Sequence, residues 1–555
     1  MADKDVIIIG GGPSGICTAV QLQRLIGHQH FHIYERADGL GGVWFNNTYP
    51  GCAVDIPAHF YSYSFALKPD WDKLYPDRSA LSNYLNDICD EYDIHRRSTT
   101  GVECISQVWN EARSLWTVTF RQTKDHSITF TREASVVVNA VGKLDLPAIP
   151  TIEGQDLFEG QAFHSARWDH SVQLENKHVI VLGNGASATQ FVPLIAPKVK
   201  RLSQFVRSAH YIQERHNETF SPTFKWVMKN VPLACKLYRW AWAVEYDLGF
   251  GAFFMTPDGE KKRRAVAQET WDYIDKAAPK KYKDILSPDY LVGCRRRVHS
   301  NNYLESLHRS NVDLMKDDIV QVTANSVKTR SGREYYADVI IYACGFRTQD
   351  WFDPMKIRGR GGQDMHEQWE SRGSVQAYYG TMVDNFPNWF TLYGPNTASG
   401  HNSVIYVTEC QVEFLCKLLK PVLKGGAKTV VPRTEAQLSL NRSLQARLPG
   451  LTFSSGCTSW YLDRNGNNTF VWPDYAFKYW MSTYRVRWND LEVKYPNKYS
   501  QLGASVFGLK EFGLCAGGAV LLLCGRLWSD QLCGLTADML SESLRVVDIL
   551  RHKLL

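Results

Sequence analysis

Two glycine-rich turns constrain the fold of this 555-residue chain more than any other feature. The first turn follows a strand-like run, Val6 to Ile9, and precedes a run with helical apolar spacing, Ile16 to Leu25. A second strand-like run, Phe31 to Tyr34, comes next. Strand, glycine turn, helix and parallel strand make up the start of a dinucleotide-binding unit. The sequence therefore predicts an α/β fold that opens with a Rossmann-like module.

The same order of elements recurs in the middle of the chain. A strand-like run, His178 to Leu182, leads into GNGASA at Gly183 to Ala188, then into a helix through Ile195 and a strand around Leu202 to Val206. A chain of this length is also too long for one ordinary core. We therefore expect two Rossmann-like, three-layer dinucleotide-binding domains.

The segments between and after these modules indicate how the domains are divided. Val136 to Pro150 reads as a buried strand followed by a proline-marked crossover, and Phe220 to Ser287 is helical and tryptophan-rich. A second crossover, near Asp384 to Asn388, returns the chain to the first module. The predicted divisions are a first module at 1–148, a second at 149–384 with a helical insertion at about 215–290, a return at 385–490 and an unassigned extension at 491–555.

The first fingerprint has the residues that a nucleotide diphosphate requires. Gly10, Gly12 and Gly15 allow a tight turn and a close approach of the backbone to a pyrophosphate at a helix N-terminus. Glu35 ends the next strand about 20 residues further on, where a carboxylate accepts hydrogen bonds from an adenosine ribose.

The second fingerprint differs in its acidic position. It has Gly183, Gly185 and Ala188, but its second strand ends at Arg207 instead of an acid. A guanidinium at that place suits a 2′-phosphate, so NADPH is preferred over NADH. Two such modules in one chain indicate electron transfer from a nicotinamide to a flavin.

Composition excludes several other classes of protein. Lysine and arginine number 63 against 57 acidic residues, with no basic block suited to nucleic acid. The 13 cysteines include no C-x-x-C pair, which disfavours a zinc ribbon or a disulfide reductase and leads us to expect reduced thiols and no metal. No signal peptide is expected, because the charged N-terminus runs straight into the first glycine turn. No clear membrane segment is expected either, because Gly513 to Gly525 falls short of the roughly 20 residues that a spanning helix needs. We expect a cytoplasmic protein.

Two longer motifs carry a family resemblance. Phe158 to Asp169 fits F-x-G-x-x-x-H-x-x-x-W-[PD], with His164 and Trp168 at the histidine and tryptophan positions. Gly41 to Asp55 is similar to G-x-W-x-x-x-x-Y-P-G-x-x-x-D, through Gly42, Trp44, Tyr49, Pro50, Gly51 and Asp55. On these motifs the chain, from about Asp5 to Met481, resembles the Baeyer–Villiger monooxygenases, in particular those of fungal secondary metabolism.

The resemblance implies an activity and a set of site residues. FAD and NADPH would be the cofactors, and one atom of O2 would enter beside a ketone carbonyl, through a flavin C4a peroxide, to give an ester or lactone. GCRRRVHSNNYLE resembles the segment with the active-site arginine, which falls at Arg296, with Arg297 leaving the register open by one residue. Asp55 would orient Arg296, while Arg295 and Trp460 would contact NADP. His164 and Trp168 are expected to serve domain coupling and packing.

Three alternatives remain open at this point. A flavin monooxygenase that oxidises nitrogen or sulfur shares both modules and a similar core motif. Hydroxylation at carbon by the same flavin chemistry is also compatible with the family, because a fold does not determine an activity. The third alternative is a dinucleotide-binding sensor without turnover, which the presence of Asp55 and Arg296 disfavours.

Overall fold

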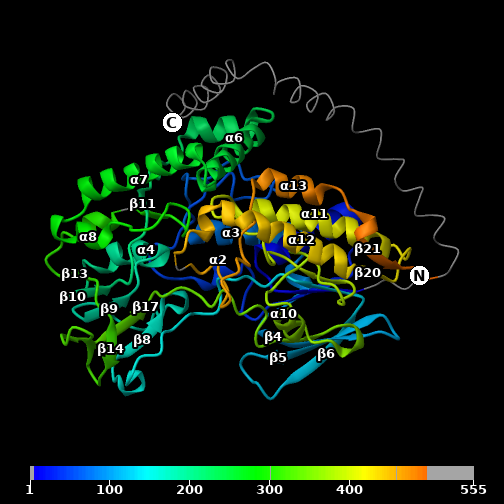
Figure 1. Cartoon of the computed structure of the whole chain (residues 1–555), viewed down its shortest axis with the longest axis horizontal. Coiled ribbons are helices and arrows are strands. Elements are labelled where there is room, and N and C mark those ends of the chain that lie inside the picture. Colours follow the sequence, from blue (N-terminus) through cyan, green and yellow to red (C-terminus); the bar gives the residue numbers. More distant parts are fainter. Residues whose placement is uncertain (1–4, 301, 458, 497–555) are drawn as a thin grey trace.

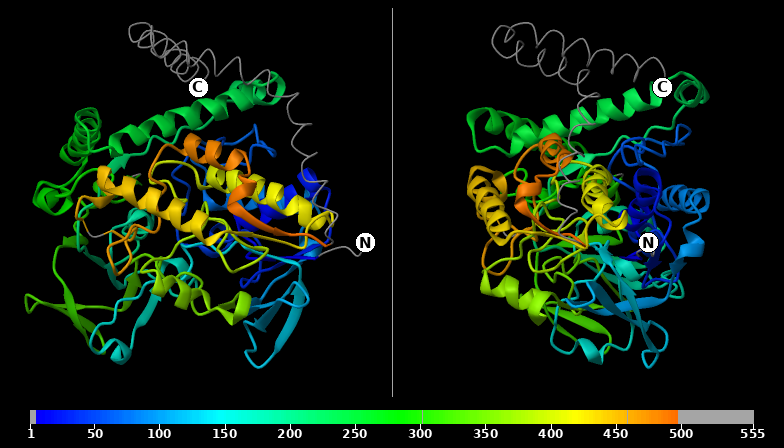
Figure 2. Two further views of the ribbon diagram at one scale, coloured as in Figure 1. Left: turned by 45° about the vertical axis from the view of Figure 1, so that its right-hand side comes forward. Right: turned by 90° about the vertical axis from the view of Figure 1, so that its right-hand side faces the viewer.

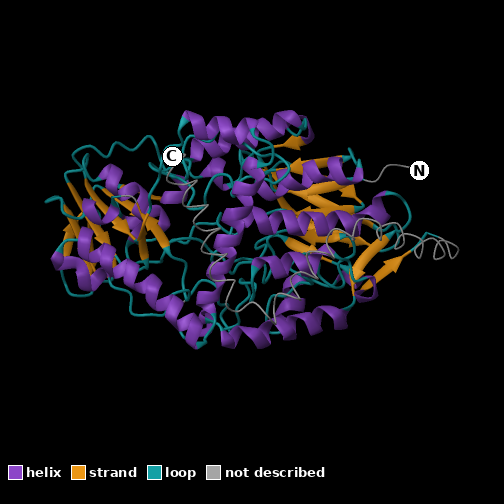
Figure 3. Ribbon diagram, turned by 90° about the horizontal axis from the view of Figure 1, so that it is seen from above, coloured by secondary structure: helices purple, strands orange, loops and turns teal. Residues whose placement is uncertain are grey.

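Two parallel sheets lie at opposite ends of the molecule (Figure 3) in the computed structural model, which describes residues 5–300, 302–457 and 459–496. The first sheet has the order β19-β7-β1-β2-β3. Its strands are β1 (Val6–Ile9), β2 (Phe31–Tyr34), β3 (Ser98–Thr99), β7 (Val136–Asn139) and β19 (Trp389–Thr391). Because β19 pairs with β7 across about 250 intervening residues, the first module is discontinuous in sequence.

The second sheet has the order β13-β10-β9-β17-β8, again parallel throughout. Its strands are β8 (Gln161–His164), β9 (His178–Leu182), β10 (Arg201–Phe205), β13 (Val312–Met315) and β17 (Val339–Tyr342). Strands in both sheets are buried on two faces, as Ile8 and Val181 show with no exposed surface. This burial explains why they read as unbroken apolar runs rather than alternating ones.

Helices complete the layers around both sheets. In the first module, α1 (Pro13–Gln21) packs against α11 (Val404–Leu423), and α4 (Ala186–Ile195) follows β9 in the second. The other helices are α2 (Val43–Asn46), α3 (Arg78–Glu91), α9 (Tyr303–Ser306), α10 (Met365–Ser371), α12 (Thr434–Arg447) and α13 (Ala476–Tyr484). The prediction of two Rossmann-like domains in an α/β fold is confirmed.

The helical insertion interrupts the second module between β11 (Ile212–Glu214) and β12 (Val298–Ser300). It consists of α5 (Pro222–Asn230), α6 (Ala234–Leu248), α7 (Pro257–Ala277) and α8 (Lys283–Leu286). The hydroxyls of Ser221 and Thr256 cap α5 and α7, each of which has proline in its first turn. In both views of Figure 2 the green insertion helices lie along one edge of the molecule, above α11 to α13.

Smaller antiparallel sheets flank this framework (Figure 1). One comprises antiparallel β4 (Val102–Asn110), β5 (Leu115–Gln122) and β6 (Thr129–Ala134), with β18 (Lys356–Arg358) added parallel to β4. Two further sheets comprise β14 (Ile319–Val322), β15 (Ser326–Thr329) and β16 (Glu334–Tyr336), and β20 (Thr429–Pro432) with β21 (Leu491–Lys494). The β20–β21 pairing attaches the residues just after 490 to the body of the protein.

The structure bears on two expectations from composition, the lack of a membrane segment and the reduced state of the cysteines. Among the described residues, no helix is long and apolar enough to cross a membrane, and Gly513 to Gly525 lie outside them. The expectation of reduced thiols is wrong for one pair, because Cys294 and Cys457 form a disulfide. Their separation of 163 residues explains why no short cysteine spacing revealed it.

Candidate active site

The first fingerprint is a tight turn that the glycines make possible. Gly10 has φ of +102°, in the region that glycine adopts readily, and Gly12 caps α1. A Cβ atom on Gly15 would lie 2.0 Å from the carbonyl oxygen of Gly10, so only glycine fits there. A Cβ on Gly42 would lie 2.8 Å from Cα of Gly12, which places the Gly41 to Asp55 motif directly against this turn.

Glu35 lies where β2 ends, beside the same turn. Its carboxylate accepts hydrogen bonds from the backbone N–H groups of Gly11 (2.6 Å) and Ala37 (2.7 Å). Burial raises the pKa of Glu35, and these two N–H donors partly oppose that rise. An acceptor fixed in this way beside the N-terminus of α1 can bind a ribose hydroxyl while the helix end binds phosphate.

The second fingerprint repeats this geometry with an open approach. Gly183 has φ of +111°, and Gly185 caps α4. A Cβ atom on Gly185 would meet no atom within 4 Å, so there is free space for a phosphate at this helix end. Ala188 is fully buried in α4, where its small side chain permits close packing. Both turns therefore fit a dinucleotide.

A cluster of cations gathers at the carboxyl end of β10. Arg207 is exposed there, and Arg295 donates a hydrogen bond from Nη1 to the Oγ of Ser208 at 2.5 Å. Burial, followed by the charges of Arg295 and Arg207, lowers the pKa of His210 to about 4. Two guanidiniums and a hydroxyl can bind a phosphate monoester. Neither Ser208 nor His210 was predicted, although both lie within three residues of Arg207.

Arg296 and Asp55 meet although they are 241 residues apart. Nη2 of Arg296 donates to both carboxylate oxygens of Asp55, at 2.9 and 2.8 Å. Burial raises the pKa of Asp55, but the charges of Arg296, His299 and Arg215 outweigh it, so the pKa is lowered. Asp55 in turn raises the pKa of Arg296. The structure thus places Arg296, and not Arg297, against Asp55 and keeps both charged.

Three tyrosines surround this ion pair, two of them buried and Tyr393 half-buried, and none was predicted. Burial raises the pKa of Tyr61, Tyr393 and Tyr461, to about 12 for Tyr461, while the charge of Arg296 lowers each in part. The ring of Trp44 stands edge-on to Tyr61, at a centroid distance of 5.6 Å. The three tyrosines come from distant segments of the chain. Tyr461 directly follows the predicted site residue Trp460, whereas Tyr61 and Tyr393 are not adjacent to any predicted site residue.

Trp460 is held by the segment that follows β17. Its carbonyl oxygen accepts hydrogen bonds from Thr348 Oγ1 (3.2 Å) and Gln349 Nε2 (2.8 Å). Its ring lies 4.6 Å from those of Tyr461 and Phe470. Trp460 therefore belongs to the same surroundings as Arg296, through Tyr461.

The two remaining motif residues lie in packing positions. His164 ends β8, accepts a hydrogen bond from the backbone N–H of Ala166 and has its pKa lowered to about 4 by burial. Trp168 packs against Phe163 and Phe191, each at a ring distance of 5.2 Å. Neither has a recorded contact with Arg296 or Asp55.

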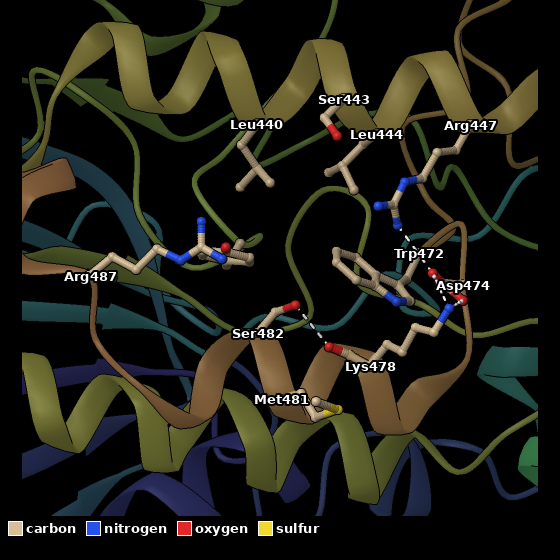
Figure 4. A pocket seen from close by; sticks show the side chains of 11 residues that line it. Leu440, Ser443, Leu444, Arg447, Trp472, Asp474, Lys478, Met481, Ser482 and Arg487 are labelled. Atoms are coloured by element: carbon tan, nitrogen blue, oxygen red, sulfur yellow. Dashed lines mark hydrogen bonds and ion pairs between the residues drawn. The ribbon is translucent and has the colours of Figure 1, made fainter. Parts of the chain in front are cut away.

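A separate cavity of about 380 Å³ opens between α12 and α13 (Figure 4). Arg447 and Lys478 both form ion pairs with Asp474 on its wall. None of its lining residues was predicted as a site residue. No cluster of three potential metal ligands occurs in the part of the chain that the structure describes.

Comparison with known proteins agrees with both modules. Residues 8–75 match a family model described as an NAD(P)-binding Rossmann-like domain. A Baeyer–Villiger monooxygenase of Streptomyces coelicolor is 34% identical over 90% of this chain and 94% of its own length. An FAD-binding monooxygenase of Aspergillus niger is 32% identical over 88% of this chain and 81% of its own length. The NADP+-bound structure of a cyclohexanone monooxygenase from Rhodococcus sp. Phi1 superposes with a TM-score of 0.78, at 25% identity, over 89% of this chain and 99% of that one.

Proposed function

This chain belongs to the Baeyer–Villiger monooxygenase family, and we propose that Arg296 and Asp55 are its active-site pair for inserting oxygen beside a ketone carbonyl. FAD and NADPH are its cofactors. The observation that carries the proposal is the Arg296–Asp55 ion pair, since it joins a segment next to the first fingerprint with a segment of the second module.

The residues divide between the two cofactors according to their positions. Gly10, Gly12, Gly15 and Glu35 would hold the FAD diphosphate and ribose, with Gly42 and Trp44 towards the flavin. Gly183, Gly185 and Ala188 would hold the NADPH diphosphate, Arg207 and Arg295 its 2′-phosphate, and Trp460 its nicotinamide end. FAD held by these residues would supply the acceptance of hydride from NADPH and the activation of O2.

Arg296 would stabilise the negative charge that develops on the oxygen of the ketone. Its guanidinium is oriented by Asp55 before any substrate arrives, so little reorganisation accompanies the reaction. A preorganised donor of this type contributes about 10²–10³ in rate. The raised pKa values of Tyr61, Tyr393 and Tyr461 keep their protons in place near neutral pH. These tyrosines could therefore donate hydrogen bonds near Arg296 while they remain protonated.

The proposal is tested with purified, FAD-loaded protein, NADPH and ¹⁸O2. Cyclic, linear and aryl ketones are supplied, and products are identified by mass spectrometry. We expect an ester or lactone that contains one labelled oxygen for each NADPH consumed. A hydroxylated ketone with the carbonyl retained, or oxidation confined to added thioethers and amines, would establish one of the rival activities instead. If no ketone changes the rate of NADPH consumption, the result would support the alternative of a dinucleotide-binding sensor without turnover.

A further inference from the structure

The disulfide between Cys294 and Cys457 joins two segments that both reach the proposed active site. Their Cα atoms lie 6.3 Å apart. Cys294 directly precedes Arg295 and Arg296, and Cys457 lies three residues before Trp460. One covalent bond therefore ties the segment with the active-site arginine to the segment with Trp460 and Tyr461.

The two sulfur atoms differ in their surroundings. Cys294 has no exposed surface, whereas Cys457 is half-buried and follows three exposed residues, 454–456. A reagent in solution can therefore approach the sulfur of Cys457 more readily than that of Cys294. Among the eight free cysteines of the described residues, seven are buried. The eighth, Cys344, is exposed two residues after β17, so what distinguishes Cys294 and Cys457 is that they are paired beside Arg296 and Trp460.

Non-covalent contacts hold the two ends of this junction. A Cβ atom on Gly293 would lie 2.3 Å from the ring of Phe253, so the segment before Cys294 is tightly enclosed by the insertion. The rings of Phe253 and Phe453 lie 4.9 Å apart, and Met255 N–H donates to the carbonyl oxygen of Gly450 at 2.9 Å. These contacts anchor the chain up to Phe453. Trp460 and Tyr461 are held at the other end, by Gln349 and Phe470, and between the two ends the disulfide ties the chain to the segment of Arg296.

We propose that Cys294 and Cys457 form a redox-reversible modification site that controls how firmly the Trp460–Tyr461 segment is held against Arg296. Its reactants are a peroxide and a dithiol. One thiol and hydrogen peroxide give a sulfenic acid and water, and the second thiol displaces a second water to form the disulfide. A dithiol reverses this by two exchanges, so that two thiols are restored and the dithiol becomes a disulfide.

Opening the disulfide removes this tie, so that the position of Trp460 and Tyr461 relative to Arg296 is left to be fixed when NADPH binds. Ordering costs of this kind weaken binding by roughly three- to tenfold for one immobilised side chain. The expected effect is a rise of that size in the KM for NADPH, with the flavin content unchanged. The inference rests on the roles proposed above for Arg296 and Trp460.

The test uses the FAD-loaded full chain after treatment with hydrogen peroxide or with dithiothreitol, each removed before assay. Alkylation with iodoacetamide and peptide mapping report the state of Cys294 and Cys457, and NADPH oxidation is followed with and without ketone. We expect a cross-linked peptide only after peroxide, together with the lower KM. Cys457→Ser should have the higher KM and no response to either reagent. Cys235→Ser, which replaces a buried free cysteine of α6, should respond like the wild type.

Two results would overturn the inference. One is alkylation of both cysteines after peroxide treatment, which would mean that no cross-link forms. The other is a cross-link that opens and closes without a change in KM. Comparing the two redox states of the wild type does not depend on how any variant folds. Absence of ester in both states would instead count against the proposed function, because the peptide map and NADPH oxidation are read independently of product.

Discussion

Nη2 of Arg296 lies within 2.9 Å of both carboxylate oxygens of Asp55, so a single donor nitrogen spans the whole carboxylate. Asp55 is the last residue of the Gly41 to Asp55 motif, and Arg296 lies between the insertion and β12. Two segments far apart in sequence are thereby fixed relative to one another. This contact makes Asp55 a positioning residue for Arg296, and its removal should affect turnover more than cofactor binding.

Asp55→Asn keeps the shape of the side chain but removes its charge. We expect kcat for ester formation to fall roughly tenfold or more, since the orientation of Arg296 is lost, while the KM for NADPH stays within about twofold. Steady-state assays of ester and NADPH give both values. Asp313→Asn, which removes the partner of Arg201 in an ion pair on β10 and β13, is the matched control and should change neither. An unchanged kcat in Asp55→Asn would show that Asp55 does not position Arg296.

Arg207 and Arg295 should distinguish NADPH from NADH. Replacing either with alanine removes a charge-assisted contact to the 2′-phosphate, and we expect the KM for NADPH to rise about 10- to 100-fold. The KM for NADH, which lacks this phosphate, should stay nearly constant. Arg201→Ala, which replaces an exposed arginine at the start of β10, serves as the control. Equal losses for both nucleotides would place the 2′-phosphate elsewhere.

Glu35→Gln tests the proposed FAD site. The amide keeps one acceptor oxygen, but the charged acceptor for Gly11, Ala37 and a ribose hydroxyl is lost. We expect flavin to dissociate during gel filtration, with the ratio of flavin to protein absorbance falling well below that of the wild type. Excess FAD should restore activity. Full flavin retention in a folded variant would argue against a ribose contact at Glu35.

His59 should make stability depend on pH. Burial lowers its pKa to about 4, so the folded protein does not bind this proton until about pH 4, whereas the unfolded chain binds it below about pH 6.5. Stability should therefore fall as the pH drops from 6.5 towards 4, by about 1.4 kcal/mol per pH unit for this residue. Urea unfolding at pH 6.5, 5.5 and 5.0 should show a shallower decline in His59→Phe. His126→Phe, at an exposed position, should keep the slope of the wild type, and parallel slopes in all three proteins would contradict the prediction.

Most of the framework could be predicted because it depends on local patterns. β1, β2 and β9 are short apolar runs beside glycine turns, and they begin and end where the sequence predicts. β4 was missed, because a register shift between Cys104 and Ser106 breaks the alternation of its apolar residues. The insertion was predicted from helical apolar spacing, although its capping residues, Ser221 and Thr256, were not singled out.

The site was less predictable where it depends on contacts between distant segments. Family motifs pointed to Asp55 and Arg296, yet only the structure resolves which of the adjacent arginines meets Asp55. Tyr61 and Tyr393 lie in ordinary aromatic surroundings in the sequence and gave no signal. The Cys294–Cys457 disulfide was missed because pairing across 163 residues leaves no trace in cysteine spacing.

The most direct test of the central claim compares Arg296→Ala and Arg296→Lys with the wild type, measuring labelled ester and NADPH consumed in the same reaction. If Arg296 stabilises the charge on the substrate oxygen, the alanine variant should bind FAD, oxidise NADPH and yield about 10²–10³-fold less ester, with lysine recovering part of it. Ester formation by Arg296→Ala at the rate of the wild type would contradict the assignment of Arg296 and Asp55 as the active-site pair.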